Sequence, residues 1–372
     1  MEASGTFPPQ RMRVLTKLKT ILQRAPKNAR SNRWWIVWGG KVYFRSNNLD
    51  IKVSETWPGH VRNWVASVPR YSLLTERLRN SALSPEKSAI FLTELGMFGN
   101  MCRRLANGLS LGSSIDSGSV IVPKDVIFHE GIFRQGTHKI ANIRTLWIGS
   151  APSRRTNDVA AMFVGDMFSL QGWDTPSVNH HVDEAWRTLK DILMGDSNQT
   201  PFGPETLAIH LRGGDVFGPR KPRAYGQPPL SYYELVLRSA TWKEVVLVHQ
   251  DESNPVLPGI RDLCAKLNIE VRNQSGTVLE DVGTLMRAES IVAGRGTFVP
   301  AVANLSRYCT TVFFFEDKCN LIPKRSGIRL VRVADLEKNY KVAILSNNWQ
   351  NTPEQREMMT SYPLSSLVME GP

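Results

Sequence analysis

Short apolar runs alternate with amphipathic segments between residues 88 and 194, and this alternation predicts strands separated by helices. Apolar side chains that recur every three or four residues indicate the helices, and Gly112 is expected to end the first of them. The predicted strands cover residues 89–93, 120–123 and 144–148, and the predicted helices cover residues 101–111 and 183–194.

After residue 205 the alternation becomes more regular. A capping box of Ser231 and Glu234 is expected to open one helix. Strands and helices at this spacing are typical of a parallel, doubly wound α/β sheet. Ligands of such a sheet bind beyond the carboxyl ends of the strands, where the strand order reverses. The predicted strands are 207–211, 245–248, 269–271, 291–293 and 311–315, and the other predicted helices are 260–267, 279–288 and 299–305.

The first 80 residues follow a different pattern. Two β-rich runs, 34–38 and 41–44, flank Gly39-Gly40 and predict a hairpin, whose tryptophans fit either sugar stacking or the packing of a small core. Residues 11–24 contain no acidic side chain and carry leucines at helical spacing. This segment fits a solvated helix, a helix that contacts an anionic membrane surface, or an import signal.

A polar segment rich in turn-forming residues, 197–205, predicts a domain boundary. We therefore expect a basic N-terminal extension with a hairpin, two Rossmann-like domains and a C-terminal helix or tail. A chain of 372 residues is too long for one ordinary core, which agrees with this division. The expected regions are 1–80, 81–200, 201–345 and 346–372.

Composition and charge narrow the function classes. Hydrophobic residues make up 41% and charged residues 22% of the chain, which indicates a globular protein. No apolar run reaches the roughly 18 residues of a membrane span. Residues 1–26 contain no apolar core of a secretory signal. The net charge is +12, but residues 1–45 hold ten basic side chains and one acidic side chain, so the rest of the chain is nearly neutral. We therefore expect no specific nucleic-acid partner for the two main domains.

Metal and disulfide chemistry find little support in the sequence. The four cysteines form no CxxC pair, so we expect free buried thiols, with one bridge between Cys309 and Cys319 as the alternative. No two aspartates stand in the D-x-D spacing with which many glycosyltransferases hold a metal. We therefore expect no metal and no other cofactor, so that arginine and helix dipoles would meet the charge of a diphosphate.

One segment, HLRGGD, follows the first predicted strand of the second domain. Arg212 lies at the carboxyl end of the strand, where its fork of donors fits a diphosphate. His210 shares its face of the strand and can donate to a phosphate or sugar oxygen. Gly213 and Gly214 allow backbone N–H groups to approach an anion, and Asp215 can orient Arg212 or act as a base. The same residue types also fit a strand-end ion pair, and the residues alone do not decide between the two.

Two other glycine loops precede predicted helices. In the loop GRGTF, the backbone at Gly296 and the hydroxyl of Thr297 form an anion site at a helix start, and Phe298 can face a base or ribose. In the loop GMFGN, Gly99 allows close approach of the backbone, and Asn100 is a candidate helix cap. Each loop also fits an ordinary helix-capping turn.

These three loops, in this order, resemble the signatures of the fucosyltransferase superfamily, which comprises α1,2- and α1,6-fucosyltransferases and protein O-fucosyltransferases. GMFGN followed by LANGL resembles the first-domain signature, HLRGGD resembles H-x-R-R-x-D, and Thr297-Phe298 resembles the late loop, with Asp281 as the acid on the preceding helix. The resemblance spans about residues 88 to 360. It implies a GT-B fold with two facing Rossmann-like domains, and GDP-fucose as the donor, used without metal and with inversion.

Carried over residue by residue, the resemblance implies a set of donor contacts. Arg212 would bind the β-phosphate and stabilise the departing GDP, and His210 would hydrogen-bond the donor. Thr297 and the following amide would hold phosphate. Phe298 and Asp281 would contact the nucleoside, with Asp281 at the guanine edge.

The acceptor side and the base are less complete. The resemblance implies that Gly99 and Asn100 lie near the sugar or the acceptor, which is a glycan or a glycoprotein. The second arginine of the family pattern is Gly213 here, and no carboxylate follows the motif as it does in the α1,6 enzymes. Asp215 and Glu130 are the remaining candidates for the catalytic base.

The sequence therefore predicts a metal-independent, inverting glycosyltransferase that transfers fucose from GDP-fucose. The alternatives are an inactive nucleotide- or glycan-binding protein, an enzyme for another nucleotide sugar such as GDP-mannose or UDP-xylose, and a nucleic-acid binder that works through residues 1–45. The resemblance implies the Golgi or secretory lumen, and the lack of a recognisable signal makes the cytoplasm the alternative.

Overall fold

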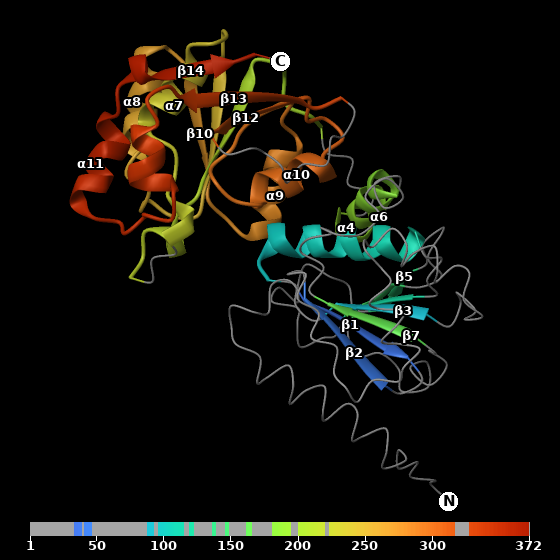
Figure 1. The fold of residues 1–372 in the computed structure, drawn as a ribbon. Coiled ribbons are helices and arrows are strands. Elements are labelled where there is room, and N and C mark those ends of the chain that lie inside the picture. The colour runs from blue at the N-terminus through green and yellow to red at the C-terminus, as the bar shows by residue number, and fades with distance from the viewer. Residues whose placement is uncertain are drawn as a thin grey trace, which may run out of the picture. The chain divides into compact units, whose positions relative to one another are not determined.

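The structure, a computed structural model, describes residues 33–38, 41–46, 88–92, 96–114, 119–122, 136–138, 146–148, 161–165, 181–194, 200–219, 223–316 and 327–371. The chain divides into two units, Met1–Gly195 and Asp196–Pro372, and each contains a seven-stranded sheet with helices packed on it (Figure 1). The predicted helix over residues 11–24 lies outside the described residues.

The first unit has a mixed sheet in the order β2-β1-β7-β3-β4-β6-β5. Strands β7, β3, β4 and β6 run parallel, and the pairs β1–β2, β1–β7 and β5–β6 are antiparallel. The parallel centre is what a strand–helix–strand rhythm predicts. The strands are β1 (Arg33–Trp38), β2 (Lys41–Ser46), β3 (Ser88–Leu92), β4 (Ser119–Val122), β5 (Gly136–His138), β6 (Leu146–Ile148) and β7 (Ala161–Gly165).

The predicted hairpin around Gly39-Gly40 is confirmed, because β1 and β2 pair with Trp38 opposite Lys41. It is not a separate extension, however. β1 also pairs with β7, from Trp34 opposite Gly165 to Trp38 opposite Ala161, so the hairpin is the edge of the first sheet. The sequence did not reveal this because the strand that receives the hairpin lies more than 100 positions later in the chain.

In the part of the first unit that the structure describes, the helices are α4 (Phe98–Ser114) and α6 (Val182–Met194), which pack against each other. Helix α4 begins three residues earlier than predicted, so Asn100 lies inside its first turn and is not a cap. It also continues through Gly112, because tertiary packing overrides the weak helix propensity of one glycine. In the described part of the chain, no helix is both long and apolar enough to cross a membrane.

The second unit follows a regular strand–helix order. Its helices are α7 (Leu230–Leu237), α8 (Leu257–Lys266), α9 (Val278–Met286), α10 (Phe298–Leu305) and α11 (Pro353–Ser361), with short turns η4 (Gly214–Val216), η5 (Arg223–Tyr225), η6 (Lys341–Leu345) and η7 (Leu364–Ser366). Its strands are β8 (Thr206–Leu211), β9 (Glu244–His249), β10 (Glu270–Gln274), β11 (Ser290–Val292), β12 (Thr311–Phe315), β13 (Arg329–Asp335) and β14 (Leu367–Glu370).

The sheet order β10-β9-β8-β11-β12-β13-β14 is that of a Rossmann fold. Counted from β8, the six parallel strands read 3-2-1-4-5-6, and β14 is added antiparallel to β13. Helices α7, α8 and α11 pack together on one face, and α9 and α10 pack together on the other (Figure 1). The predicted doubly wound sheet is therefore confirmed for this unit.

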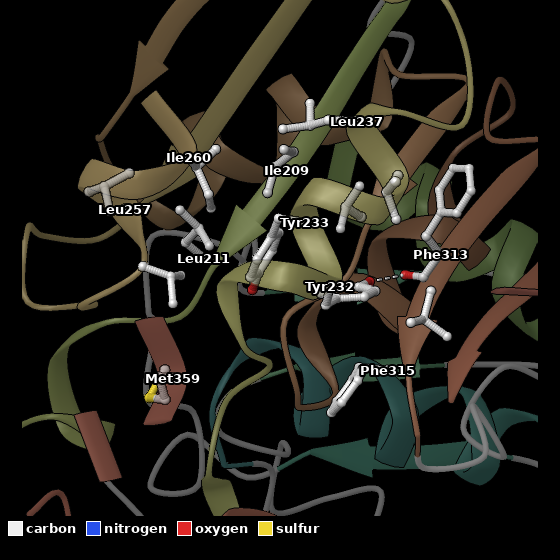
Figure 2. Packing of buried hydrophobic residues seen from close by; sticks show 14 of the residues in the cluster. Ile209, Leu211, Tyr232, Tyr233, Leu237, Leu257, Ile260, Phe313, Phe315 and Met359 are labelled. Carbon is white, nitrogen blue, oxygen red and sulfur yellow. Dashed lines mark hydrogen bonds between the residues drawn. The ribbon is translucent and has the colours of Figure 1, made fainter. Parts of the chain in front are cut away.

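The core of the second unit fixes the direction of β8. Ile209 and Leu211 are buried in the cluster on the side of α7 and α8 (Figure 2), where each such side chain contributes roughly 1.5–3 kcal/mol. The Tyr232 hydroxyl of α7 donates to the Phe313 carbonyl oxygen at 2.9 Å and joins the helix to β12. Since successive strand residues point to opposite faces, His210 points toward the face of α9 and α10.

Several local predictions for the second unit were wrong. Pro229 is the N-cap of α7 and Ser231 is buried, so the predicted capping box is absent there. The capping boxes described in this unit open α9 at Thr277 and α11 at Thr352. The expected C-terminal tail contains α11 but ends in β14, which belongs to the sheet. Cys309 is buried, and Cys319 lies outside the described residues, so a bridge between them stays a prediction.

Candidate functional site

The reversal of strand order in the second sheet lies between β8 and β11. These two strands are parallel neighbours, with Leu207 opposite Ser290 and Ile209 opposite Val292, so the loops that follow them leave the sheet at the same edge. From β8 the chain turns toward β9, and from β11 it turns toward β12. The predicted loops HLRGGD and GRGTF are therefore brought together at the switch point of the sheet.

Arg212 is the central side chain of this site. Its Nη2 lies 3.0 Å from Oδ2 of Asp215, and its guanidinium lies 4.3 Å from the ring centre of Tyr225. The side chains of Arg212 and Asp215 are 25% and 62% exposed, so the pair is open to water. An ion pair of this exposure contributes about 0–1 kcal/mol, which a diphosphate can outcompete. The ion-pair interpretation of the motif is therefore confirmed, and the pair leaves the guanidinium partly exposed. Binding of a diphosphate by Arg212 stays a prediction.

The glycines after Arg212 contact a carboxylate that the sequence analysis did not select. The Gly214 N–H donates to Oδ2 of Asp251 at 2.9 Å, and Asp251 also accepts from the backbone and the hydroxyl of Ser253. Burial raises the pKa of Asp251, but the hydrogen bonds from Ser253 and Gly214 outweigh it and the pKa falls below its ordinary value. The Gly214 amide, predicted to approach a ligand anion, is thus occupied by an anion of the protein itself.

The same carboxylate explains why residue 213 is glycine. A Cβ atom at Gly213 would collide with the Asp251 side chain. Gly214 has φ of 56°, a conformation that favours glycine, and a Cβ atom there would lie 2.6 Å from Oε1 of Gln250. The position that holds a second arginine in the family pattern is therefore filled by a packed loop.

His210 stacks on Phe298, with ring centres 4.8 Å apart and an angle of 20° between the planes. Its Nδ1 is buried and has no hydrogen-bond partner among the residues that the structure describes. Burial, with a further contribution from the charge of Arg212, lowers the pKa of His210 to about 3. The imidazole is therefore neutral at physiological pH, and it can donate to a ligand without adding a positive charge.

The second loop approaches Arg212 from β11. Gly294 N–H donates to the His210 carbonyl oxygen at 3.1 Å, which joins the two loops through their backbones. Gly296 has φ of 141°, and a Cβ atom there would lie 3.0 Å from Nη1 of Arg212. Thr297 is the N-cap residue of α10, without the side-chain hydrogen bond that caps usually make. The backbone of this loop therefore runs directly beside the guanidinium.

Asp281 lies in the first turn of α9, where Nε2 of Gln274 donates to its Oδ1 at 3.4 Å. Burial raises the pKa of Asp281 to about 6. Among the described residues, no hydrogen bond joins Asp281 to the loops HLRGGD or GRGTF. Its assignment to a guanine edge stays a prediction.

The residues predicted for the acceptor side belong to the first unit. Gly99 and Asn100 lie in the first turn of α4, after Gly96, whose φ is 73°. Their role near a sugar or an acceptor stays a prediction, and Glu130 lies outside the described residues. In the described ranges, no group of three histidine, cysteine or acidic side chains is placed to hold a metal ion.

Three further side chains complete the switch-point site and were missed in the sequence. They are Tyr225, Gln227 and Asp251. Asp251 follows the end of β9 by two residues, so the rule that ligands bind beyond strand ends could have found it. Tyr225 ends the short turn η5 and Gln227 follows it before α7, and no periodic pattern marks either residue in the sequence.

Two Rossmann-like units in one chain, the second with an arginine at its switch point, have the domain content of the GT-B fold class. Neither a family model nor a curated protein sequence matches the chain. Among solved structures, POFUT1 in complex with GDP is similar at 10% identity and a TM-score of 0.33, over 63% of this chain and 100% of that one. The ADP-heptose lps heptosyltransferase II of E. coli is similar at 12% identity and a TM-score of 0.31, over 66% and 89%.

Proposed function

We propose that this chain is a metal-independent, inverting glycosyltransferase that transfers fucose from GDP-fucose to a hydroxyl of a glycan or glycoprotein. The observation that supports this most is the placement of Arg212. Its partly exposed guanidinium stands at the switch point, between the ring of Tyr225 and the backbone of Gly296. A fixed cation beside a helix N-terminus suits the two phosphates of a nucleotide sugar.

In the proposed reaction the acceptor hydroxyl attacks the anomeric carbon while the bond from that carbon to the β-phosphate oxygen breaks. The bonding electrons go to the phosphate, and Arg212 stabilises the charge that builds there. Neutral His210 donates a hydrogen bond to the donor. The hydroxyl proton passes to a carboxylate, for which Asp215 is the candidate at this site.

The carboxylates around the loop favour a second candidate function, that of an inactive nucleotide-binding protein. Asp215 pairs with Arg212, and Asp251 occupies the Gly214 amide. A ligand diphosphate would have to compete with both. Such a site could bind a nucleotide without positioning its sugar for transfer.

A thermal-shift screen against GDP-, UDP- and ADP-sugars in EDTA tests the proposal, followed by a GDP-release assay with GDP-fucose. We expect selective stabilisation by GDP and GDP-fucose, because a ligand at 100 times its Kd adds about 2.7 kcal/mol to folding. Stabilisation with GDP release from GDP-fucose supports the enzyme. Stabilisation without release supports the inactive binder. Selective stabilisation by another nucleotide sugar would assign that sugar as the donor in place of GDP-fucose. No stabilisation by any of them contradicts both the enzyme and the inactive binder.

A further inference from the structure

A fully buried glutamine lies between the two loops of the switch-point site. Gln227 stands in the segment between η5 and α7 and has no exposed surface. A side-chain amide carries an acceptor oxygen and two N–H donors, and burying them without partners is costly. The partners of Gln227 therefore show what its burial achieves.

The amide of Gln227 pairs with the backbone of two segments. Its Oε1 accepts from Arg295 N–H at 3.0 Å, and its Nε2 donates to the Arg295 carbonyl oxygen at 3.4 Å. The same Nε2 donates to the Tyr225 carbonyl oxygen at 2.8 Å. One side chain thus holds both backbone groups of Arg295 and joins them to Tyr225, 68 positions and two positions away from it in sequence.

Each of the two partners of Gln227, Tyr225 and Arg295, lies next to one of the candidate phosphate-binding groups. The ring of Tyr225 packs on Arg212, with the guanidinium carbon 4.3 Å from the ring centre. Arg295 directly precedes Gly296 and Thr297, which lead into α10. Gln227 therefore connects the support of the guanidinium with the start of the helix.

Gln227 is itself anchored to the core. The main-chain carbonyl oxygen of Gln227 accepts a hydrogen bond from the Tyr340 hydroxyl at 2.7 Å, and Tyr340 is fully buried. Nη1 of Arg295 donates to the Leu345 carbonyl oxygen at 2.8 Å, so the side chain of Arg295 is held as well as its backbone. The backbone of Gly226 packs against the carbonyl oxygen of Ile344. Gln227, Tyr225 and Arg295, which we call the clamp, are thus held by the C-terminal segment around η6, which lies outside both loops.

We infer that Gln227 is a positioning residue that sets the spacing between Arg212 and the amino end of α10, so that both meet the phosphates of one nucleoside diphosphate. This inference rests on the proposed function, because it needs a phosphate-bearing ligand at the site. It predicts that Gln227 controls the binding of phosphates and leaves the binding of the nucleoside alone.

The test compares GDP with guanosine in the full chain. Gln227→Met keeps the approximate volume and removes every hydrogen bond of the amide. We expect its GDP affinity to fall about tenfold, with guanosine affinity unchanged within about twofold. Gln227→Glu, which keeps the acceptor and loses the donors, is the second variant if Gln227→Met does not fold. Ser306→Ala is the matched control. The hydroxyl of Ser306 is buried and donates to the Met286 carbonyl oxygen, but Ser306 lies at the carboxyl end of α10, away from both loops.

Hydrogen exchange of the Arg295 amide provides a measurement that needs no ligand. We expect slow exchange in the wild-type chain and exchange at least about tenfold faster in the Gln227 variants. Fast exchange in the wild type, or equal loss of GDP and guanosine affinity in Gln227→Met, overturns the inference. Slow wild-type exchange without any GDP binding overturns the proposed function and the phosphate role, while the clamp itself stands.

Discussion

The two loops of the switch-point site are held in different ways. The loop after β8 is neutralised by carboxylates of the protein, since Asp215 pairs with Arg212 and Asp251 accepts from Gly214 N–H. The loop before α10 is held by uncharged groups, among them the amide of Gln227 and the carbonyl oxygen of Leu345. Both loops were predicted as anion sites from similar glycine-rich sequences.

This difference separates two kinds of candidate anion site. In the proposed function, an incoming phosphate displaces a carboxylate to reach Arg212, and at the start of α10 it meets preorganised backbone. We therefore propose that the first loop supplies charge and the second supplies geometry. Variants that remove the charge of Arg212, disturb the packing at Gly213 or remove the carboxylate of Asp215 should therefore affect the first loop more than the second.

Removal of the guanidinium should have the largest effect. In Arg212→Ala the leaving diphosphate loses its positive partner, and we expect turnover of GDP-fucose to fall on the order of 100-fold or more. Release of GDP measures the rate. Arg238→Ala is the control, because it removes an ion pair of similar length that Arg238, at the end of α7, makes with Glu234 at 2.8 Å. Equal rates in wild type and Arg212→Ala would show that the first loop does not supply the charge.

Introducing the second arginine of the fucosyltransferase signature at position 213 should destabilise the protein. Gly213→Arg places a Cβ atom against the Asp251 carboxylate, and such overpacking costs about 1–3 kcal/mol. Urea unfolding measures the loss, and Asp251→Ala in the same chain should recover part of it. Gly203→Arg is the control, since a Cβ atom there meets no atom within 4 Å. A Gly213→Arg variant as stable as Gly203→Arg would contradict the claim that Asp251 leaves no room for a side chain at position 213.

Removal of the competing carboxylate should strengthen GDP binding. In Asp215→Asn the charge of Arg212 is no longer neutralised, so we expect GDP affinity to rise about two- to fivefold and stability to change by less than about 1 kcal/mol. Calorimetric titration measures the affinity. The turnover of the same variant tests Asp215 as the base. Weaker GDP binding in Asp215→Asn would mean that the carboxylate supports the ligand and does not compete with it.

The pH dependence of stability should report on His210. Its pKa is lowered from 6.5 to about 3, so the unfolded chain gains a proton first as the pH falls, and stability is lost from about pH 6.5 downward. His210→Gln lacks this uptake, and between pH 6.5 and pH 4 its Tm should fall several degrees less than that of the wild type. Parallel Tm curves for the two proteins would contradict a buried, neutral imidazole.

Much of the second unit could be predicted because its strands and helices have strong local patterns. β12 matches its predicted bounds, and β8 and α10 begin one residue earlier than predicted. The order of these elements also predicted that HLRGGD and GRGTF follow parallel strands. The start of α7 was mispredicted because Ser231 fits a cap by composition, whereas tertiary packing buries it.

The contacts that complete the site could not be predicted in this way. Gln227 reaches Arg295 across 68 positions, and Asp251 reaches Gly214 across 37. Neither pairing leaves a periodic trace in the sequence. The motif also left an ion pair and a ligand site as alternatives. The structure contains the ion pair, whose side chains are partly exposed, and the ligand site stays a prediction.

Binding of GDP in the presence of EDTA tests the central claim most directly, because Arg212 is proposed to take the place of a metal ion at the diphosphate. Calorimetric titration of the wild type, Arg212→Ala and Arg238→Ala should show binding to the first and third proteins and about 100-fold weaker binding to Arg212→Ala. Equal affinity of all three proteins for GDP would contradict the claim, as would binding that disappears when EDTA is added.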